Sequence, residues 1–131
     1  MVFESRNKVG DKPEWSVDTD TQTVTHIHPR TGETEEHRFV RDYIRYHLHF
    51  CEEYHPERLQ KLLDNGEIFQ YLSDLDNNVF DALDRQETLL QENSDEYKIT
   101  VEKGDLVAVG TIGNAITQQA RESVFEAMIY V

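Results

Sequence analysis

The sequence contains very few of the residues that mark secreted or membrane proteins. Cys51 is its only cysteine among 131 residues, so no disulfide can form within the chain, and a reducing, cytoplasmic setting is expected. No apolar run approaches the roughly 20 residues of a membrane span. The first 15 residues also lack the apolar centre of a signal peptide. We therefore expect a soluble intracellular protein that does not associate with membranes.

Basic residues are also scarce, with 13 Lys and Arg against 26 Asp and Glu and a net charge of −13. Residues 57–97 hold 11 of the acids and 3 of the bases, a net charge of −8. Binding to nucleic acid or to an anionic membrane requires cationic side chains, so both are disfavoured. A protein partner with a basic surface is favoured instead, and acidity that serves solubility alone is the alternative.

Motifs of the common catalytic sites are missing. The chain has no GxSxG elbow, and its glycines lack the spacing of a phosphate-binding loop or a dinucleotide fingerprint. A lone cysteine with scattered histidines is not a protease signature. We therefore expect a protein that is not an enzyme and has no cofactor.

The hydrophobic pattern predicts a mainly α fold in a single domain, 1–131. Residues 1–13 read as a loose lead-in, and 14–33, rich in Thr, Val and Ile with a turn at Pro29–Gly32, read as a β-hairpin or small meander. Apolar residues then recur at three and four, which predicts a bundle of about four helices. Their expected ranges are 34–54 with Thr34 as N-cap, 56 to the Asn65-Gly66 pair, 67–92, and 100–130 after a connection at 93–100.

The stretch YLSDLDNNVFDALDRQE, residues 71–87, is the most acidic feature. Asp74 to Asn78 imitates the start of an EF-hand loop, but Val79 stands where the sharp turn needs Gly. Arg85 stands where the bidentate Glu belongs. The helical periodicity is a further argument against a calcium loop.

On a helix, these acids spread around the polar side and do not converge on one point, which argues against paired acid and base catalysis. Carboxylates three or four residues apart are about 5–6 Å apart, the order of the phosphate spacing along a nucleic-acid strand. We predict a partner-binding surface that imitates nucleic acid, with a solvated helix face as the alternative. Its residues are Asp74, Asp76, Asp81, Asp84, Glu87 and Glu92.

Two further clusters can be drawn from the sequence. His47, Cys51 and His55 follow at intervals of four, so two adjacent members could share a zinc ion with ligands from His26, His28 or His37. The alternative for Cys51 is a buried structural thiol. Arg38, Arg41 and Arg45 recur at three and four and form a short basic patch on the predicted first helix.

Two blocks of the chain resemble a known family. The first runs from Tyr54 to Asp76 and carries His55-Pro56, Leu59, Leu62-Leu63, Asn65-Gly66, Ile68 and Tyr71 to Asp76. The second carries Asn114 to Ile116, Ala120 to Glu122, Val124 and Met128 to Tyr130. They resemble the HRPxLYxxLLxSGxLxxYLxDID run and the NNIRxxAREIVxxELIY tail of TnpV, small transposon-encoded proteins of bacterial mobile elements. The resemblance covers about residues 45–131 and does not extend to residues 1–33.

The resemblance implies a helical fold and a mobile-element setting, and it supplies no catalytic residue. Together with the charge, it leads to the hypothesis of a non-enzymatic inhibitor that blocks a basic nucleic-acid-binding partner, such as an anti-CRISPR protein acting on a Cas nuclease. Two alternatives stay open: an accessory protein of transposition or conjugation, and a small zinc-stabilised protein.

Overall fold

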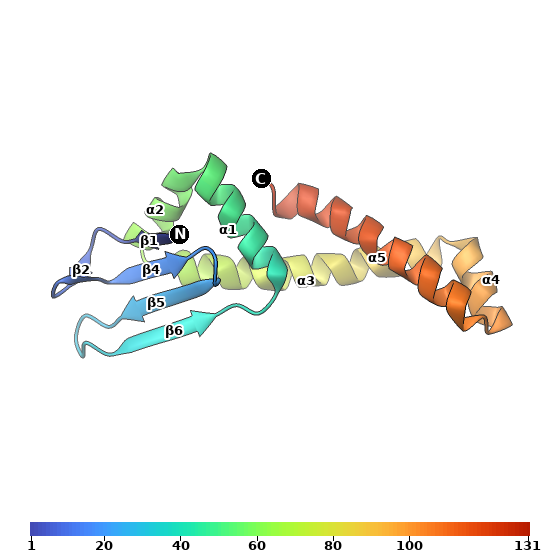
Figure 1. Cartoon of the computed structure of the whole chain (residues 1–131), viewed down its shortest axis with the longest axis horizontal. Coiled ribbons are helices and arrows are strands. Elements are labelled where there is room, and N and C mark those ends of the chain that lie inside the picture. Colours follow the sequence, from blue (N-terminus) through green and yellow to red (C-terminus); the bar gives the residue numbers. More distant parts are fainter. The chain divides into compact units, whose positions relative to one another are not determined.

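The computed structural model describes all residues, 1–131, and divides into two compact units. The first unit is Met1–Asp76 and the second is Asn77–Val131. Helix α3 (Ile68–Glu92) begins in the first unit and ends in the second (Figure 1). The prediction of a single domain is not tested by this division and stays a prediction.

A four-stranded antiparallel sheet forms the first part of unit one, in the order β1-β4-β5-β6. Its strands are β1 (Val2–Glu4), β4 (Trp15–Asp18), β5 (Thr23–Ile27) and β6 (Thr34–Arg38). A two-stranded ribbon, β2 (Lys8–Val9) with β3 (Lys12–Pro13), lies within the β1–β4 connection. Alternate residues of a strand point to opposite faces, so buried Val17 and Val24, which are cross-strand partners, mark the core face.

Helices α1 (Asp42–Tyr54), α2 (Pro56–Asp64) and the start of α3 supply the rest of this core. Pro56 occupies the first turn of α2, where its missing N–H is not needed. The helix ends in a Schellman motif, because the Glu67 N–H donates to Leu62 O at 2.8 Å and Gly66 has φ +69°. The fully buried side chains of this unit include Ile44, Leu48, Leu59, Leu63, Ile68 and Leu72.

The second unit contains the remainder of α3, α4 (Asp95–Lys103) and α5 (Leu106–Met128). Ser94 caps α4 by accepting from the Tyr97 N–H at 3.1 Å, and Asp105 caps α5 by accepting from the Ala108 N–H at 3.1 Å. Between them Gly104, at φ +70°, ends α4. Helices α4 and α5 pack together, and the Tyr97 ring of α4 lies 4.0 Å from where a Cβ on Gly113 of α5 would be, an ordinary contact distance.

The prediction of a mainly α fold is confirmed, since 60% of the chain is helical. The predicted boundaries of α2 and α3, the hairpin β4–β5 and the turn at Pro29–Gly32 are also confirmed. No helix is long and apolar enough to cross a membrane.

Three predictions were wrong. Residues 34–38 form strand β6 and not the start of a helix, because Thr34 to Arg38 pair along β5 and Arg41, not Thr34, is the N-cap residue of α1. A connection over 93–100 followed by one helix over 100–130 was expected, but 95–103 form a helix of their own, α4, and α5 begins only at Leu106, after Gly104 and Asp105. The lead-in 1–13 is ordered in three short strands, so the strand content exceeds a hairpin.

Candidate functional site

The predicted acidic surface of α3 is only partly available to a partner. Asp74, Asp81, Asp84 and Glu92 are exposed, whereas Asp76 and Glu87 are half-buried. Asp76 is used within the first unit: Arg41 Nη1 lies 3.3 Å from its Oδ1, and its backbone carbonyl accepts from the Tyr43 hydroxyl at 3.1 Å. Asp76 is therefore a structural residue.

Three of the acids lie on the part of α3 that belongs to the second unit, namely Asp81, Asp84 and Glu92. At 100° per residue they fall within about 80° of one another, on one side of the helix. None of the three forms an ion pair. We call these three carboxylates the α3 stripe. Asp74 belongs to the first unit, where Gln70 Nε2 donates to its Oδ1 at 2.8 Å.

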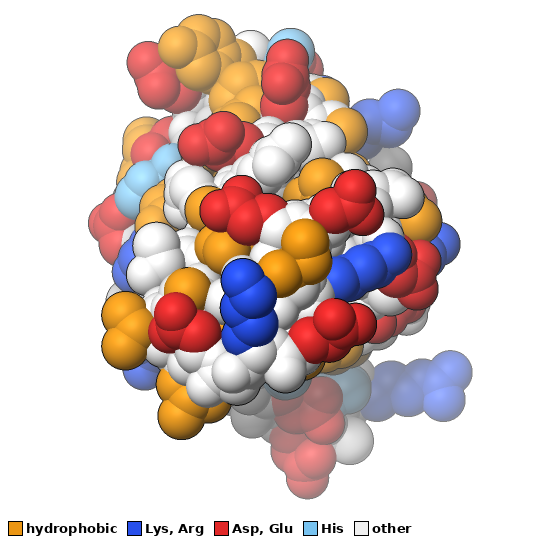
Figure 2. Space-filling view, turned by 90° about the vertical axis from the view of Figure 1, so that its right-hand side faces the viewer, with side chains coloured by type: hydrophobic (Ala, Val, Ile, Leu, Met, Phe, Trp, Pro, Cys, Tyr) orange, Lys and Arg blue, Asp and Glu red, His pale blue; other side chains and the backbone are white.

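The second unit carries ten acidic and four basic residues, a net charge of −6. It also exposes large apolar side chains at the start of α5, where Leu106 is 83% and Val107 81% exposed. Figure 2 views the molecule from the end that carries α4 and the start of α5, and there acidic, basic and apolar side chains are interspersed. This end is therefore a mixed surface and not a continuous sheet of carboxylates.

The predicted basic patch is not formed as expected. Arg38 ends strand β6, Arg41 precedes α1 and pairs with Asp76, and only Arg45 lies within the helix. The three side chains therefore do not share a helix face. The cause is the strand that replaces the first turns of the predicted helix.

His47 and Cys51 do lie together, with Nε2 and Sγ 3.5 Å apart, but no third possible metal ligand joins them. His47 Nε2 is also 2.7 Å from the Tyr71 hydroxyl, and Arg58 Nη1 is 3.6 Å from the sulfur. Burial raises the pKa of the Cys51 thiol, which disfavours the thiolate that a metal requires. His55 faces Glu57 at 3.4 Å. The buried structural alternative for Cys51 is the one that this geometry supports.

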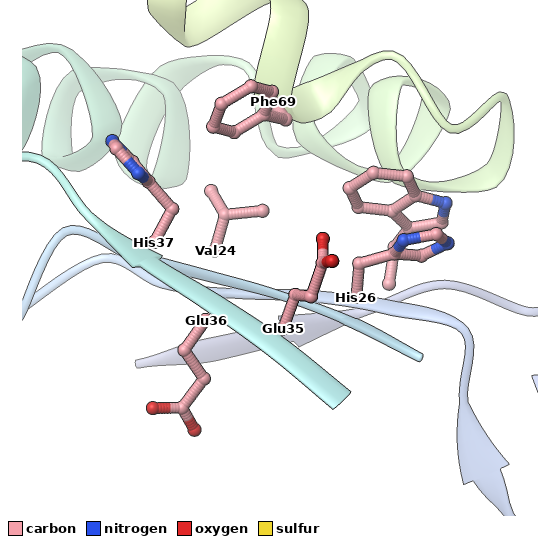
Figure 3. Close-up of a pocket in the computed structure, with 7 residues that line it drawn as sticks. Val24, His26, Glu35, Glu36, His37 and Phe69 are labelled. Carbon is pink, nitrogen blue, oxygen red and sulfur yellow. The ribbon is translucent and has the colours of Figure 1, made fainter. Parts of the chain in front are cut away.

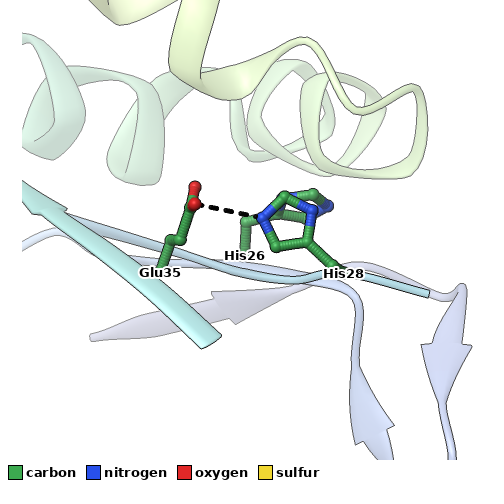
Figure 4. Close-up of side chains that lie close together, drawn as sticks. All are labelled: His26, His28 and Glu35. Carbon is green, nitrogen blue, oxygen red and sulfur yellow. Dashed lines mark ion pairs between the residues drawn. The ribbon is translucent and has the colours of Figure 1, made fainter. Parts of the chain in front are cut away.

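A different cluster of metal-ligating side chains lies on the sheet. His26 and His28 are two residues apart in an extended segment, so they point to the same face. Glu35 on β6 is the cross-strand partner of His26. One ligand atom from each of the three residues lies within 4.8 Å of the other two, and His28 Nε2 is 3.2 Å from Glu35 Oε1 (Figure 4).

The cluster borders a hollow of about 340 Å³ that is lined by Trp15, Val24, His26, Glu35, Glu36, His37 and Phe69. Trp15 stacks on His26, with ring centroids 3.9 Å apart and planes 16° apart. At the other end, His37 meets the Phe69 ring edge-to-face at 5.1 Å. In Figure 3, His26, Glu35, His37 and Phe69 lie on the helix side of the sheet, while the Glu36 carboxylate points away from it.

Sequence reasoning proposed His26, His28 and His37 as possible ligands but missed Glu35. The reading of residues 34–54 as a helix hid the pairing of β6 with β5. The signal that could have found Glu35 is the turn at Pro29–Gly32, because it joins the β-prone segment before it to the segment after it and so brings Glu35 opposite His26.

Comparisons with protein families, with curated proteins and with solved structures found no match to this chain. The resemblance to TnpV proteins therefore stays a prediction, and the function is argued from the residues.

Proposed function

We propose that the protein is a non-enzymatic acidic binding protein whose second unit occupies a basic, nucleic-acid-binding surface of a protein partner. The observation that carries the proposal is the α3 stripe: three exposed carboxylates on one side of a long helix, none of them in an ion pair. A carboxylate that is not paired with a cationic side chain of its own protein keeps its full attraction for a cationic partner.

The exposed Leu106 and Val107 support a protein as the partner, because purely electrostatic binding would not require exposed apolar side chains. Interfaces between proteins commonly combine apolar contacts at the centre with a polar rim. The second unit offers both kinds of contact, since Glu102 and Asp105 are exposed beside this apolar pair in sequence. A partner with a basic groove and apolar patches fits such a surface.

The specific form of the proposal is inhibition of an RNA-guided Cas nuclease by a protein of a mobile genetic element. Such nucleases hold their nucleic acids in positively charged channels. Its support is the acidic charge of the second unit together with the resemblance described above. A role in transposition that relies on DNA contacts through Arg38, Arg41 and Arg45 is not proposed, because these residues do not lie on one helix and Arg41 pairs with Asp76.

The test is the affinity of the protein for a purified, guide-loaded Cas nuclease at low salt. The variant D81K/D84K/E92K reverses the α3 stripe, and E33K/E53K/E67K reverses three exposed acids of the first unit with the same change in net charge. We expect the stripe variant to bind at least about tenfold more weakly. The control variant should lose less than about threefold.

High salt should weaken the wild type more than the stripe variant, because screening acts on the charges that the variant lacks. An equal loss in both variants would show a general charge effect and refute the proposed surface. Absence of binding by the wild type to every nuclease tested would refute the proposed partner.

A further inference from the structure

We propose that His26, His28 and Glu35 form a binding site for a divalent transition-metal ion, with zinc as the representative ion. The proposal concerns the first unit alone and is independent of the α3 stripe. Two imidazoles and one carboxylate are a ligand set that zinc and neighbouring first-row ions accept. The set differs from the sequence hypothesis, which paired these histidines with His47, Cys51 or His55.

Local structure explains why the three side chains meet. The extended backbone places His26 and His28 on one face, and the antiparallel register places Glu35 directly across from His26. The turn between β5 and β6 is closed by the Gly32 N–H, which donates to His28 O at 2.8 Å, and by the His28 N–H, which donates to Glu33 O at 2.9 Å. The backbone that carries the ligands is therefore fixed by hydrogen bonds.

The distances fit an ion with small side-chain rotations. Zinc bonds to nitrogen and oxygen are about 2.0–2.2 Å long, so tetrahedral ligand atoms lie about 3.4 Å apart. His28 and Glu35 already approach this separation at 3.2 Å, and the upper limit of 4.8 Å within the trio is about 1.4 Å too wide. Because His28 and Glu35 already lie at the right separation, the adjustment is a rotation of these two side chains relative to His26, and they are 37% and 71% exposed.

Neighbouring residues hold the first ligand in place. The His26 ring stacks on Trp15 and meets the His28 ring in an edge-to-face contact, with the two imidazole centroids 4.5 Å apart. Glu14 Oε1 lies 3.9 Å from His26 Nε2, so a second carboxylate stands beside the imidazole. If the ion is held by His26 Nδ1, the Nε2–H is left facing Glu14, and a carboxylate on that side of a ligating histidine orients the ring.

The site has three protein ligands, which leaves at least one coordination position for water or a small anionic ligand. His26 and Glu35 also line the hollow with Val24, His37 and Phe69, so a molecule bound to the ion would have apolar and imidazole neighbours. The ion would also join β5 to the edge strand β6, whose residues are all exposed.

The stacking on His26 provides an internal probe, because Trp15 is the only tryptophan. Protein without a polyhistidine tag is titrated with ZnCl₂ by calorimetry and with CoCl₂ while the fluorescence of Trp15 is followed. We expect one zinc ion per chain and quenching by cobalt that saturates at one equivalent. The ligand variants H28N and E35Q should each bind zinc at least about tenfold more weakly.

The matched control is H49N. His49 lies in the same unit and also faces one carboxylate, with its Nε2 3.1 Å from Asp20 Oδ1, but it has no third ligand. Zinc affinity and cobalt quenching should be unchanged in this variant, and circular dichroism should show native helix content in all three. The proposal is overturned if wild-type binding does not saturate below millimolar zinc. It is equally overturned if H28N and E35Q bind like wild type, or if H49N loses as much affinity as they do.

Discussion

Gly66 lies against Trp15, the residue that stacks on His26. Replacing Gly66 with Ala therefore tests both the stability of the first unit and the packing beside His26. Gly66 ends α2 with φ +69°, and a Cβ built on it would lie 3.2 Å from Trp15 Nε1. Non-bonded carbon contacts are ordinarily about 3.5–4.0 Å. Gly66→Ala therefore forces both an unfavourable backbone conformation and a small shift of the indole ring.

The expected loss of stability in Gly66→Ala has two parts. The left-handed conformation costs an L-residue about 1–2 kcal/mol, and the crowding of Trp15 adds about 1 kcal/mol, the low end of overpacking costs. Gly32→Ala is the matched control, because Gly32 has φ +73° but a Cβ there would meet nothing within 4 Å. We expect G66A to lower the free energy of unfolding by about 2–3 kcal/mol and G32A by about 1–2 kcal/mol.

Urea unfolding followed by Trp15 fluorescence measures both variants. The native emission of G66A should also differ from wild type, because the indole moves against His26, whereas that of G32A should not. Equal stability losses together with identical native spectra would refute the proposed contact between Gly66 and Trp15.

Two further predictions concern buried titratable side chains. Burial and the hydrogen bond to Asp76 raise the pKa of Tyr43 from 10.0 to about 12. The folded state therefore keeps a proton that the unfolded state releases, so the stabilisation is complete below about pH 10 and is lost as the pH rises towards 12. Urea unfolding should show that Y43F loses less stability than wild type between about pH 8 and about pH 11, and identical losses would contradict this. Cys51 has no exposed surface and burial raises the pKa of its thiol, so it should react with a disulfide reagent far more slowly in the native protein than in denaturant. A native rate that matches the denatured rate would show that the thiol is accessible.

Helices with clear boundary signals could be predicted from the sequence. Pro56 at the start of α2 and Asn65-Gly66 at its end are local signals with a steric cause, and the structure places both as expected. Ser94 and Asp105 cap α4 and α5 in the structure. Neither was predicted as a cap, because a connection over 93–100 and one helix over 100–130 were expected.

Strand β6 could not be predicted in the same way. Its five residues, Thr34 to Arg38, are all exposed, so they lack the alternation that usually identifies a half-buried strand. The segment is a strand because β5 pairs with it, which is a tertiary effect. Glu35 was missed for the same reason, because its position depends on this pairing. Asp76 was assigned to the partner surface because its contacts are also tertiary: Arg41 and Tyr43, which bond to it, lie 33 or more residues away in the sequence.

The most direct test of the proposed function is the affinity of a guide-loaded Cas nuclease for its target DNA, measured with and without this protein. If the second unit occupies the basic nucleic-acid channel, the apparent dissociation constant for DNA should rise in proportion to the protein concentration. The variant D81K/D84K/E92K should need at least about tenfold more protein for the same rise. An unchanged DNA affinity at protein concentrations that saturate the nuclease would place the contact elsewhere and contradict the account.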